Sequence, residues 1–216
     1  MLMTYLYTHF LDQPDFAQQA GLSSAGLRSH IAGRLCPDAS YRLDVTLSVR
    51  SFVATHDEQR PCRFHLKGHL RWLEQIERLG IADETAARAV FTARYDAARS
   101  AFLNGRLGQR LIRAAPNVPD AFDRAHADAT WGNFLDGVYG VCTRDGQPET
   151  IFLKQAGVMF IEALTAPPAE TLTEQDQALL AEAVAMLDLV ASDFAPHEVA
   201  RSSRQRCIND IRARYL

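Results

Sequence analysis

From residue 64 onward the chain consists largely of amphipathic segments with a helical repeat, separated by strong cap and break signals. Apolar residues recur every three or four positions in these segments, which predicts helices that bury one face against their neighbours. Several such helices can share a core as a bundle. The sequence therefore predicts an all-α, or mostly α, fold.

Caps and breaks predict where these helices begin and end. Asp83 is placed to cap a long helix that ends near residues 104–105, and Thr173 is placed to cap another. The prolines at 167–168 are expected to link two helices, because proline interrupts a helix. Asp120 and Pro196 are expected to open the helices that follow two further breaks.

The first forty residues predict three short helices, two of them joined by a tight turn. Residues 5–11 carry apolar side chains at helical spacing, and Pro14 favours the first turn of a second helix. Gly21 is suited to end that helix in a left-handed conformation, and Ser23 or Ser24 can cap the third. This order is a helix, a turn and a helix.

The pattern Asp15-Phe-Ala-Gln-Gln-Ala-Gly-Leu-Ser-Ser-Ala-Gly-Leu-Arg-Ser-His-Ile31 resembles the helix-turn-helix of bacterial regulators. It is similar in particular to the MerR-type form, whose Gly-Leu-Leu-Pro-like exit here reads Gly33-Arg-Leu-Cys-Pro37. The resemblance implies a tri-helical unit in which Arg28, His30 and Arg34 touch DNA. The alternative is a unit used for packing or protein docking, because residues 1–49 carry a net charge of -1 and phosphate neutralisation supplies most non-specific DNA affinity.

These signals divide the chain into three parts. Residues 1–40 form the helix-turn-helix-like unit, residues 41–62 a connecting segment or wing, and residues 63–216 the helical body. Alternating apolar and β-branched residues favour a short strand or β wing around residues 41–53, although the same run also permits a helix.

Charge and cysteine usage narrow the class of protein. Four cysteines in 216 residues are too few for a disulfide scaffold and indicate a reducing cytoplasm. No run approaches the ~18 apolar residues of a membrane span, so no membrane partner is expected. Residues 50–113 are basic and residues 114–196 strongly acidic, which predicts that they pack as complementary surfaces; a polyanion site on the basic stretch is the alternative.

One cluster has the side chains of a metal site. His56, Cys62, His65 and His69 could meet on one helix face, and Zn²⁺ favours four nitrogen and sulfur ligands. Their order matches no standard zinc-finger spacing, so the alternative is a polar helix start near Trp72. No cofactor is predicted, and zinc is kept as the alternative.

Residues 129–142 are the most unusual in composition, with three glycines among large aromatic residues. Such a segment can bend beside a pocket, which makes Trp131 and Tyr139 candidate ligand-binding residues. Cys142 is a candidate nucleophile and Lys154 a candidate base. Arg204 is a candidate anion ligand. The alternatives are a buried structural cysteine, a lysine that reaches solvent, and an arginine that faces the acidic stretch.

Over most of its length the chain resembles an uncharacterised bacterial family found with natural-product biosynthesis genes. The resemblance rests on the helix-turn-helix-like unit, Pro37-Asp-Ala-Ser-Tyr41, Phe134–Cys142 and the Ser-Ser-Arg helix near the end. It implies a pathway context and no particular reaction. The leading hypothesis is therefore a cytoplasmic bacterial protein of a specialised-metabolite pathway, whose helical body binds or transforms a small molecule or meets another pathway protein, and whose helix-turn-helix-like unit is used for packing. The alternatives are a helix-turn-helix transcriptional regulator that senses a small ligand, with nucleic acid as its partner, and a non-catalytic interaction scaffold.

Overall fold

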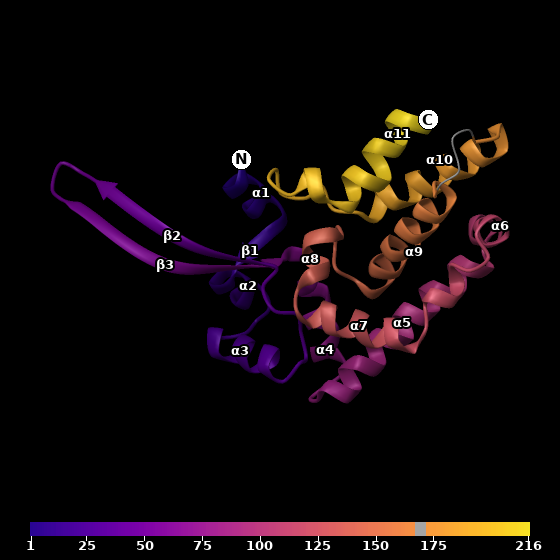
Figure 1. Cartoon of the computed structure of the whole chain (residues 1–216). Coiled ribbons are helices and arrows are strands. Elements are labelled where there is room, and N and C mark those ends of the chain that lie inside the picture. The colour runs from indigo at the N-terminus through magenta and orange to yellow at the C-terminus, as the bar shows by residue number, and fades with distance from the viewer. Residues whose placement is uncertain (167–171) are drawn as a thin grey trace.

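The computed structural model describes residues 1–166 and 172–216, and it places a small sheet with a long hairpin beside a body of helices (Figure 1). The chain is mostly helical, as predicted. The expected linker at 167–168 lies outside the described residues. Across the described ranges, no helix combines the length and the apolar content that a membrane span requires.

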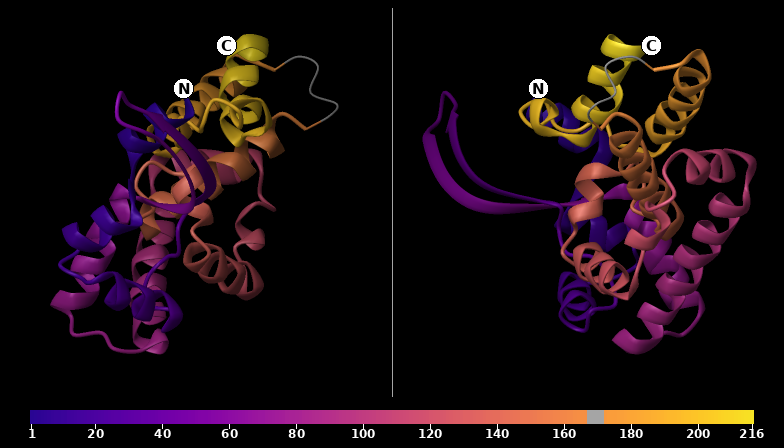
Figure 2. Two further views of the ribbon diagram at one scale, coloured as in Figure 1. Left: turned by 90° about the vertical axis from the view of Figure 1, so that its left-hand side faces the viewer. Right: turned by 45° about the vertical axis from the view of Figure 1, so that its right-hand side comes forward.

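Helices and strands alternate in the N-terminal part. The order is α1 (Leu2–His9), β1 (Phe10–Asp12), α2 (Gln13–Gln19), α3 (Ser24–Ala32), β2 (Tyr41–Arg50) and β3 (Thr55–Leu66). The sheet is antiparallel with β3 in the centre, and Phe10 pairs with Leu66 while Tyr41 pairs with Phe64. The β2–β3 hairpin projects from the rest of the molecule (Figure 2).

Two expectations for this part need correction. The first helix ends at His9, because Phe10 begins a strand that pairs with β3. A strand does lie within residues 41–53, but its partner strand runs on to Leu66, beyond the expected wing. The sheet therefore joins residues 10–12 to residues 64–66.

The body is a set of packed helices. They are η1 (Lys67–His69), α4 (Leu70–Arg78), α5 (Glu84–Asn104), α6 (Arg106–Ala114), η2 (Pro119–Ala121), α7 (Arg124–Leu135), α8 (Val138–Cys142), α9 (Pro148–Leu164), α10 (Glu174–Val190), η3 (Val199–Arg201), the π-helical η4 (Gln205–Asn209) and α11 (Asp210–Tyr215). The predicted caps Asp83 and Thr173 are confirmed, since each accepts a backbone N–H of the first turn. Asp120 and Pro196 open no α-helix: Asp123 caps α7, and a turn follows Pro196.

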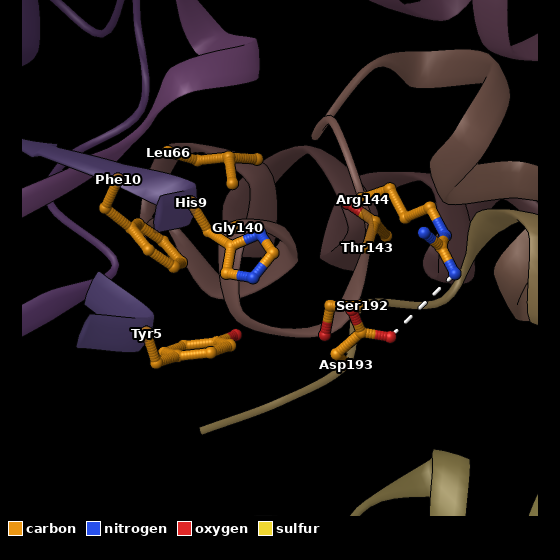
Figure 3. Close-up of a pocket in the computed structure, with 9 residues that line it drawn as sticks. All are labelled: Tyr5, His9, Phe10, Leu66, Gly140, Thr143, Arg144, Ser192 and Asp193. Atoms are coloured by element: carbon orange, nitrogen blue, oxygen red, sulfur yellow. Dashed lines mark ion pairs between the residues drawn. The ribbon is translucent and has the colours of Figure 1, made fainter. Parts of the chain in front are cut away.

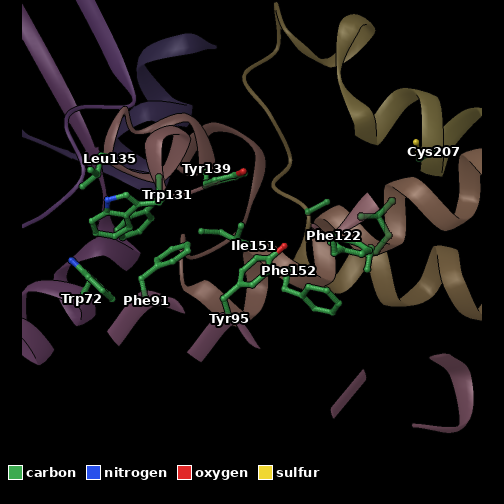
Figure 4. Packing of buried hydrophobic residues seen from close by; sticks show 14 of the residues in the cluster. Trp72, Phe91, Tyr95, Phe122, Trp131, Leu135, Tyr139, Ile151, Phe152 and Cys207 are labelled. Atoms are coloured by element: carbon green, nitrogen blue, oxygen red, sulfur yellow. The ribbon is translucent and has the colours of Figure 1, made fainter. Parts of the chain in front are cut away.

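One aromatic-rich core runs through the body and reaches the N-terminal helices. Trp72, Phe91 and Phe134 pack edge to face or tilted at its centre, with ring centroids 4.7–6.3 Å apart. Figure 4 shows Trp72 and Phe91 in this core. Phe16 of α2 and Leu27 of α3 belong to the same buried cluster. Because the N-terminal helices share this core, their position relative to the body is fixed by packing.

Ion pairs confirm the predicted match between basic and acidic stretches. Arg110 pairs with Glu182 at 2.5 Å, and Arg94 pairs with Glu149 at 2.7 Å. Arg88 also pairs with an aspartate of α7, Asp128. These pairs are partly exposed, and such pairs contribute little stability each.

Candidate functional site

Local signals build a helix, a turn and a helix from residues 13–32. Asp12 caps α2 by accepting the N–H of Asp15 at 3.1 Å, and Ser23 caps α3 by accepting the N–H of Gly26 at 3.0 Å. Gly21 lies between them with φ +71°, the left-handed conformation that ends a helix without steric cost. The turn directs the first residues of α3 away from the core.

The exposed start of α3 carries groups that can bind a nucleic acid. Ser24, Arg28 and Ser29 are exposed, whereas Leu27 is fully buried and anchors the helix. Arg28 and the hydroxyls could reach phosphates or base edges, since such donors recur at DNA-binding helices.

His30 and Arg34, the other two predicted DNA contacts, both interact with other parts of the protein. The Nδ1 atom of His30 lies 2.9 Å from the carbonyl oxygen of Gly26, so this imidazole is partly engaged with its own helix. Arg34 follows α3 with φ +57°, and its Nε atom lies 2.7 Å from Glu84 of the body. Of the three predicted residues, only Arg28 projects freely from α3.

A cationic groove of about 300 Å³ separates α3 from the base of the hairpin. Arg28 and Arg63 line it together with Asp38. Arg42 also pairs with Asp38, at 2.7 Å, and Arg63 lies 3.4 Å from the same carboxylate. Burial would raise the pKa of Asp38, but the N–H of Ala39 and the two guanidinium groups outweigh it and lower that pKa below its usual value. Two guanidinium groups therefore lie against one carboxylate, and Arg28 lines the same groove.

The four residues of the predicted metal cluster do not meet. Thr55–Leu66 is a strand, so the assumed helix face does not exist: His56 lies near the exposed tip, and Cys62 and His65 point to opposite faces. His65 and His69 are fully buried. Burial lowers the pKa of His65 to about 4 and that of His69 to about 3, so both imidazoles are neutral at neutral pH. In residues 1–166 and 172–216 no three His, Cys, Asp or Glu side chains gather to hold a metal.

Trp131 and Tyr139 belong to the core. The Trp131 indole donates to Glu84 at 3.0 Å, and the Tyr139 hydroxyl accepts from the Nε2 atom of Gln155 at 2.7 Å. Both side chains are at most 5% exposed, so the pocket expected around them is filled by protein atoms. Both residues stabilise the packing of α7 and α8 onto the body.

Lys154 lies close enough to Cys142 to lower the pKa of its thiol. Burial raises the pKa of the Cys142 thiol, and the nearby Lys154 ammonium only partly offsets this. A thiol with a raised pKa is protonated at neutral pH and is a poor nucleophile. This geometry fits a structural cysteine better than a reactive one.

Arg204 is an intramolecular link. It donates to the carbonyl oxygen of Ser192 at 2.7 Å and pairs with Asp188 of α10, also at 2.7 Å. These contacts follow the alternative in which the C-terminal arginines face the acidic stretch. Its guanidinium is thereby occupied, so Arg204 belongs to no ligand pocket.

A small cavity of about 140 Å³ lies where the N-terminal unit meets the body (Figure 3). Its lining residues are Tyr5, His9, Phe10, Leu66, Gly140, Thr143, Arg144, Ser192 and Asp193. Arg144 and Asp193 lie 3.8 Å apart at one side, and the Tyr5 hydroxyl points toward Ser192. The space is polar and has room for a few water molecules or a small ion, and its volume is below the ~300 Å³ of a typical ligand pocket.

A model of the family DUF6058, described as a family of unknown function, matches residues 87–216. The match covers more than half of the chain. The chain belongs to the DUF6058 family. Neither a curated protein nor a solved structure matches it significantly. The DUF6058 region begins inside α5 and includes α6 to α11, so the α3 surface and the hairpin lie outside it.

Two glycines of the glycine-rich segment 129–142 occupy positions where a side chain would not fit. Gly137 has φ +74°, and a Cβ atom there would lie 2.5 Å from the carbonyl oxygen of Asp38. A Cβ atom on Gly140 would collide with Ser40. These glycines let α8 approach residues 38–40 closely. The segment does border a cavity through Gly140, and Thr143 and Arg144, which follow it and which the sequence reasoning missed, line the same cavity.

Proposed function

We propose that this DUF6058 protein is a DNA-binding regulator whose α3 helix enters the major groove while the base of the hairpin contacts the flanking backbone. The observation that carries the proposal is the groove between the two elements, which Arg28 and Arg63 line together with Asp38, while Arg42 beside it pairs with the same Asp38. A helix and a two-stranded ribbon are the two elements that the major groove admits. The resemblance to the MerR-type helix-turn-helix supports the same reading.

The electrostatics predict weak binding. Residues 1–66 carry six arginines against six carboxylates, so the unit as a whole is neutral and only the groove face is locally positive. Phosphate contacts give most of the non-specific affinity and weaken steeply with salt. We therefore expect binding at low ionic strength that falls quickly as salt is added.

Fluorescence anisotropy with a duplex from the region upstream of the protein's own gene tests the proposal. Arg28→Ala should weaken binding roughly tenfold and reduce the salt slope by about one. Arg106→Ala is the matched control, since Arg106 is an exposed arginine on α6 and lies 4.0 Å from its partner Glu182. Absence of binding at low salt, or an equal loss in both variants, would contradict the proposal.

A second candidate function is small-ligand sensing, which the position of the 140 Å³ cavity favours. Its walls come from both the N-terminal unit and the DUF6058 region, so a bound ion would bias how the two parts fit together. Thermal shifts with acetate and with phosphate test this: stabilisation that Arg144→Gln abolishes supports it, and no shift with either anion rejects it. A place in a specialised-metabolite pathway and a cytoplasmic location are proposed on the resemblance and the cysteine usage alone.

A further inference from the structure

The two faces of the hairpin differ sharply. Every second residue of β2 from Leu43 to Val49 is apolar and lies on one face, and the residues between them are polar and lie on the other. At the base, Leu43 and Cys62 pack against the buried cluster of α1 and β1. Toward the tip of the hairpin the apolar face extends beyond this cluster, and Val49 is 55% exposed.

The tip of the hairpin adds two further exposed apolar side chains. Phe52 is fully exposed and Val53 is 76% exposed. A two-stranded ribbon is at best marginally stable by itself, and contiguous exposed apolar surface marks an interaction site. The apolar face of the hairpin is therefore expected to bind a partner.

A hollow on the same face lies at the base of the hairpin. This cavity of about 470 Å³ is lined mainly by apolar side chains. Those on which the argument rests are Met3, Tyr7, Val45, Leu47, Cys62 and Phe64. Phe52 of the same chain cannot fill it, because the strand between them spans roughly 20–30 Å at ~3.4 Å per residue.

We infer that the hairpins of two copies of this chain pack with their apolar faces together about a two-fold axis, so that Phe52 of each copy covers the cavity of the other. The charges on this face set the register. Glu58 and Arg60 are both exposed and flank Gln59, which pairs with Thr46 across the hairpin. An axis at that level places Glu58 of each copy against Arg60 of the other.

The same register also brings apolar residues of the two copies into contact. Val45 pairs with Arg60 and Leu47 pairs with Glu58 across the hairpin, so the axis that matches the charges also stacks Leu47 on Val45 of the second copy. Phe52 lies six residues beyond Thr46 and reaches the level of Tyr41 and Phe64 of the second copy, beside its cavity. Charge, apolar contact and cavity filling thus agree on one arrangement.

Other occupants fit this face less well. A nucleic acid or an anionic lipid surface would require an excess of cations. On this face Arg60 is balanced by Glu58, and Arg42 and Arg63 lie on the opposite face. A two-fold contact requires a surface complementary to itself, which a Glu58–Arg60 pair repeated twice provides. This inference does not depend on DNA binding.

The area predicts a weak, concentration-dependent dimer. A ribbon ten residues long and two strands wide presents a face of roughly 340 Å², about half of the ~800 Å² per partner of a standard interface. Met3 and Tyr7 beside the cavity, 44% and 52% exposed, add further contact. We expect dissociation in the micromolar range.

Sedimentation velocity of the whole chain from about 1 µM to about 500 µM tests the inference. Leu47→Glu should raise the dissociation constant at least about a hundredfold, because each copy loses a buried leucine and gains a charge. Ser48→Glu is the matched control: it adds the same charge one residue along, on the polar face, and should leave the dimer intact. Circular dichroism verifies that both variants fold.

Charge reversal tests the register. Glu58→Arg and Arg60→Glu should each weaken the homodimer, and an equimolar mixture of the two variants should restore dimers, since every cross-pair in the mixed dimer is then Arg with Glu. A wild-type chain that stays monomeric throughout, or a Leu47→Glu variant that sediments like wild type, would overturn the inference. Failure of the mixture to dimerise, or binding to phosphatidylglycerol vesicles that only Leu47→Glu abolishes, would also overturn it.

Discussion

The hairpin and the helical body treat their apolar residues in opposite ways. In the body, Phe91, Phe134 and Phe152 are at most 2% exposed and form one core, whereas the hairpin leaves Phe52 fully exposed. Cations differ as well: Arg110 and Arg204 pair with acids of the body, whereas Arg28 projects into an open groove. The N-terminal part therefore exposes an aromatic side chain and a cation of kinds that the body buries or pairs at these positions.

The largest expected difference in the free energy of unfolding is between a substitution of a core aromatic residue and one at the tip of the hairpin. Trp72→Ala should cost about 3–5 kcal/mol in the free energy of unfolding, because it leaves a cavity and removes the hydrogen bond from the indole to the carbonyl oxygen of Leu35. Phe52→Ala should change it by less than about 0.5 kcal/mol at a protein concentration low enough to avoid dimers. Urea unfolding measures both, and equal losses would contradict the contrast.

Low pH should destabilise the protein through two buried histidines, which lie where the sheet meets the helical body. His65 stacks on Phe16 of α2, and His69 packs against Phe134 of α7. Burial lowers both pKa values, to about 4 and about 3, although Asp38 near His65 and Asp145 near His69 act in the opposite direction. The unfolded chain therefore binds more protons below the ordinary pKa of 6.5, and stability falls as the pH drops from there toward 4.

The loss at pH 5 relative to pH 7 should be roughly 2 kcal/mol per imidazole. Urea midpoints of wild type and His69→Leu at the two pH values check this, because the variant should lose about half of the difference. His56→Ala is the control, since His56 is exposed in the hairpin. An unchanged pH difference in His69→Leu would show that burial of the histidines is not its source.

Two glycines should respond to alanine with opposite signs. Gly137→Ala should destabilise by about 2 kcal/mol, because φ is +74° and the new methyl group would lie 2.5 Å from the carbonyl oxygen of Asp38. Gly132→Ala, within α7 and with open space around it, should stabilise by about 0.5–1 kcal/mol. Thermal unfolding measures both; a harmless Gly137→Ala would mean that α8 and residues 38–40 separate readily.

The smallest effect compares equivalent caps in the two regions. Ser23→Ala removes the cap of α3, and Asp83→Ala removes the cap of α5, so each should cost about 1 kcal/mol. Hydrogen exchange should distinguish them: Ser23→Ala should accelerate exchange in α3 alone, whereas Asp83→Ala should affect the first turn of α5. Acceleration throughout the body in Ser23→Ala would show that the N-terminal unit is not locally independent.

Local chemistry made much of this fold predictable. Gly21, Ser23, Asp83 and Thr173 act as the sequence indicates, because a turn or a cap depends on neighbouring residues only. The second strand of the hairpin was missed, since Asp57–Pro61 is polar and includes a proline. Pro61 is tolerated there because β1 covers β3 only at residues 64–66, which leaves one side of β3 as an edge at Pro61.

The candidate site was less predictable, because it depends on contacts between residues distant in sequence. No local pattern shows that Arg34 pairs with Glu84, or that Arg204 binds the end of α10. The cavity is similar: Tyr5 and Ser192 line it from opposite ends of the chain. Arg28 alone was identified correctly as a free cation on α3, because its exposure follows from helical periodicity.

The indole of Trp72 has a consequence for how such chains can be assembled in evolution. The family match begins at residue 87, within α5, yet Trp72 covers Phe134 with a ring centroid distance of 5.1 Å. A gene fragment that starts at residue 87 would expose that phenylalanine and leave α5 without its Asp83 cap. Relatives with a different leading segment must supply another side chain in place of Trp72, so exchange of N-terminal units requires compensating changes in both pieces.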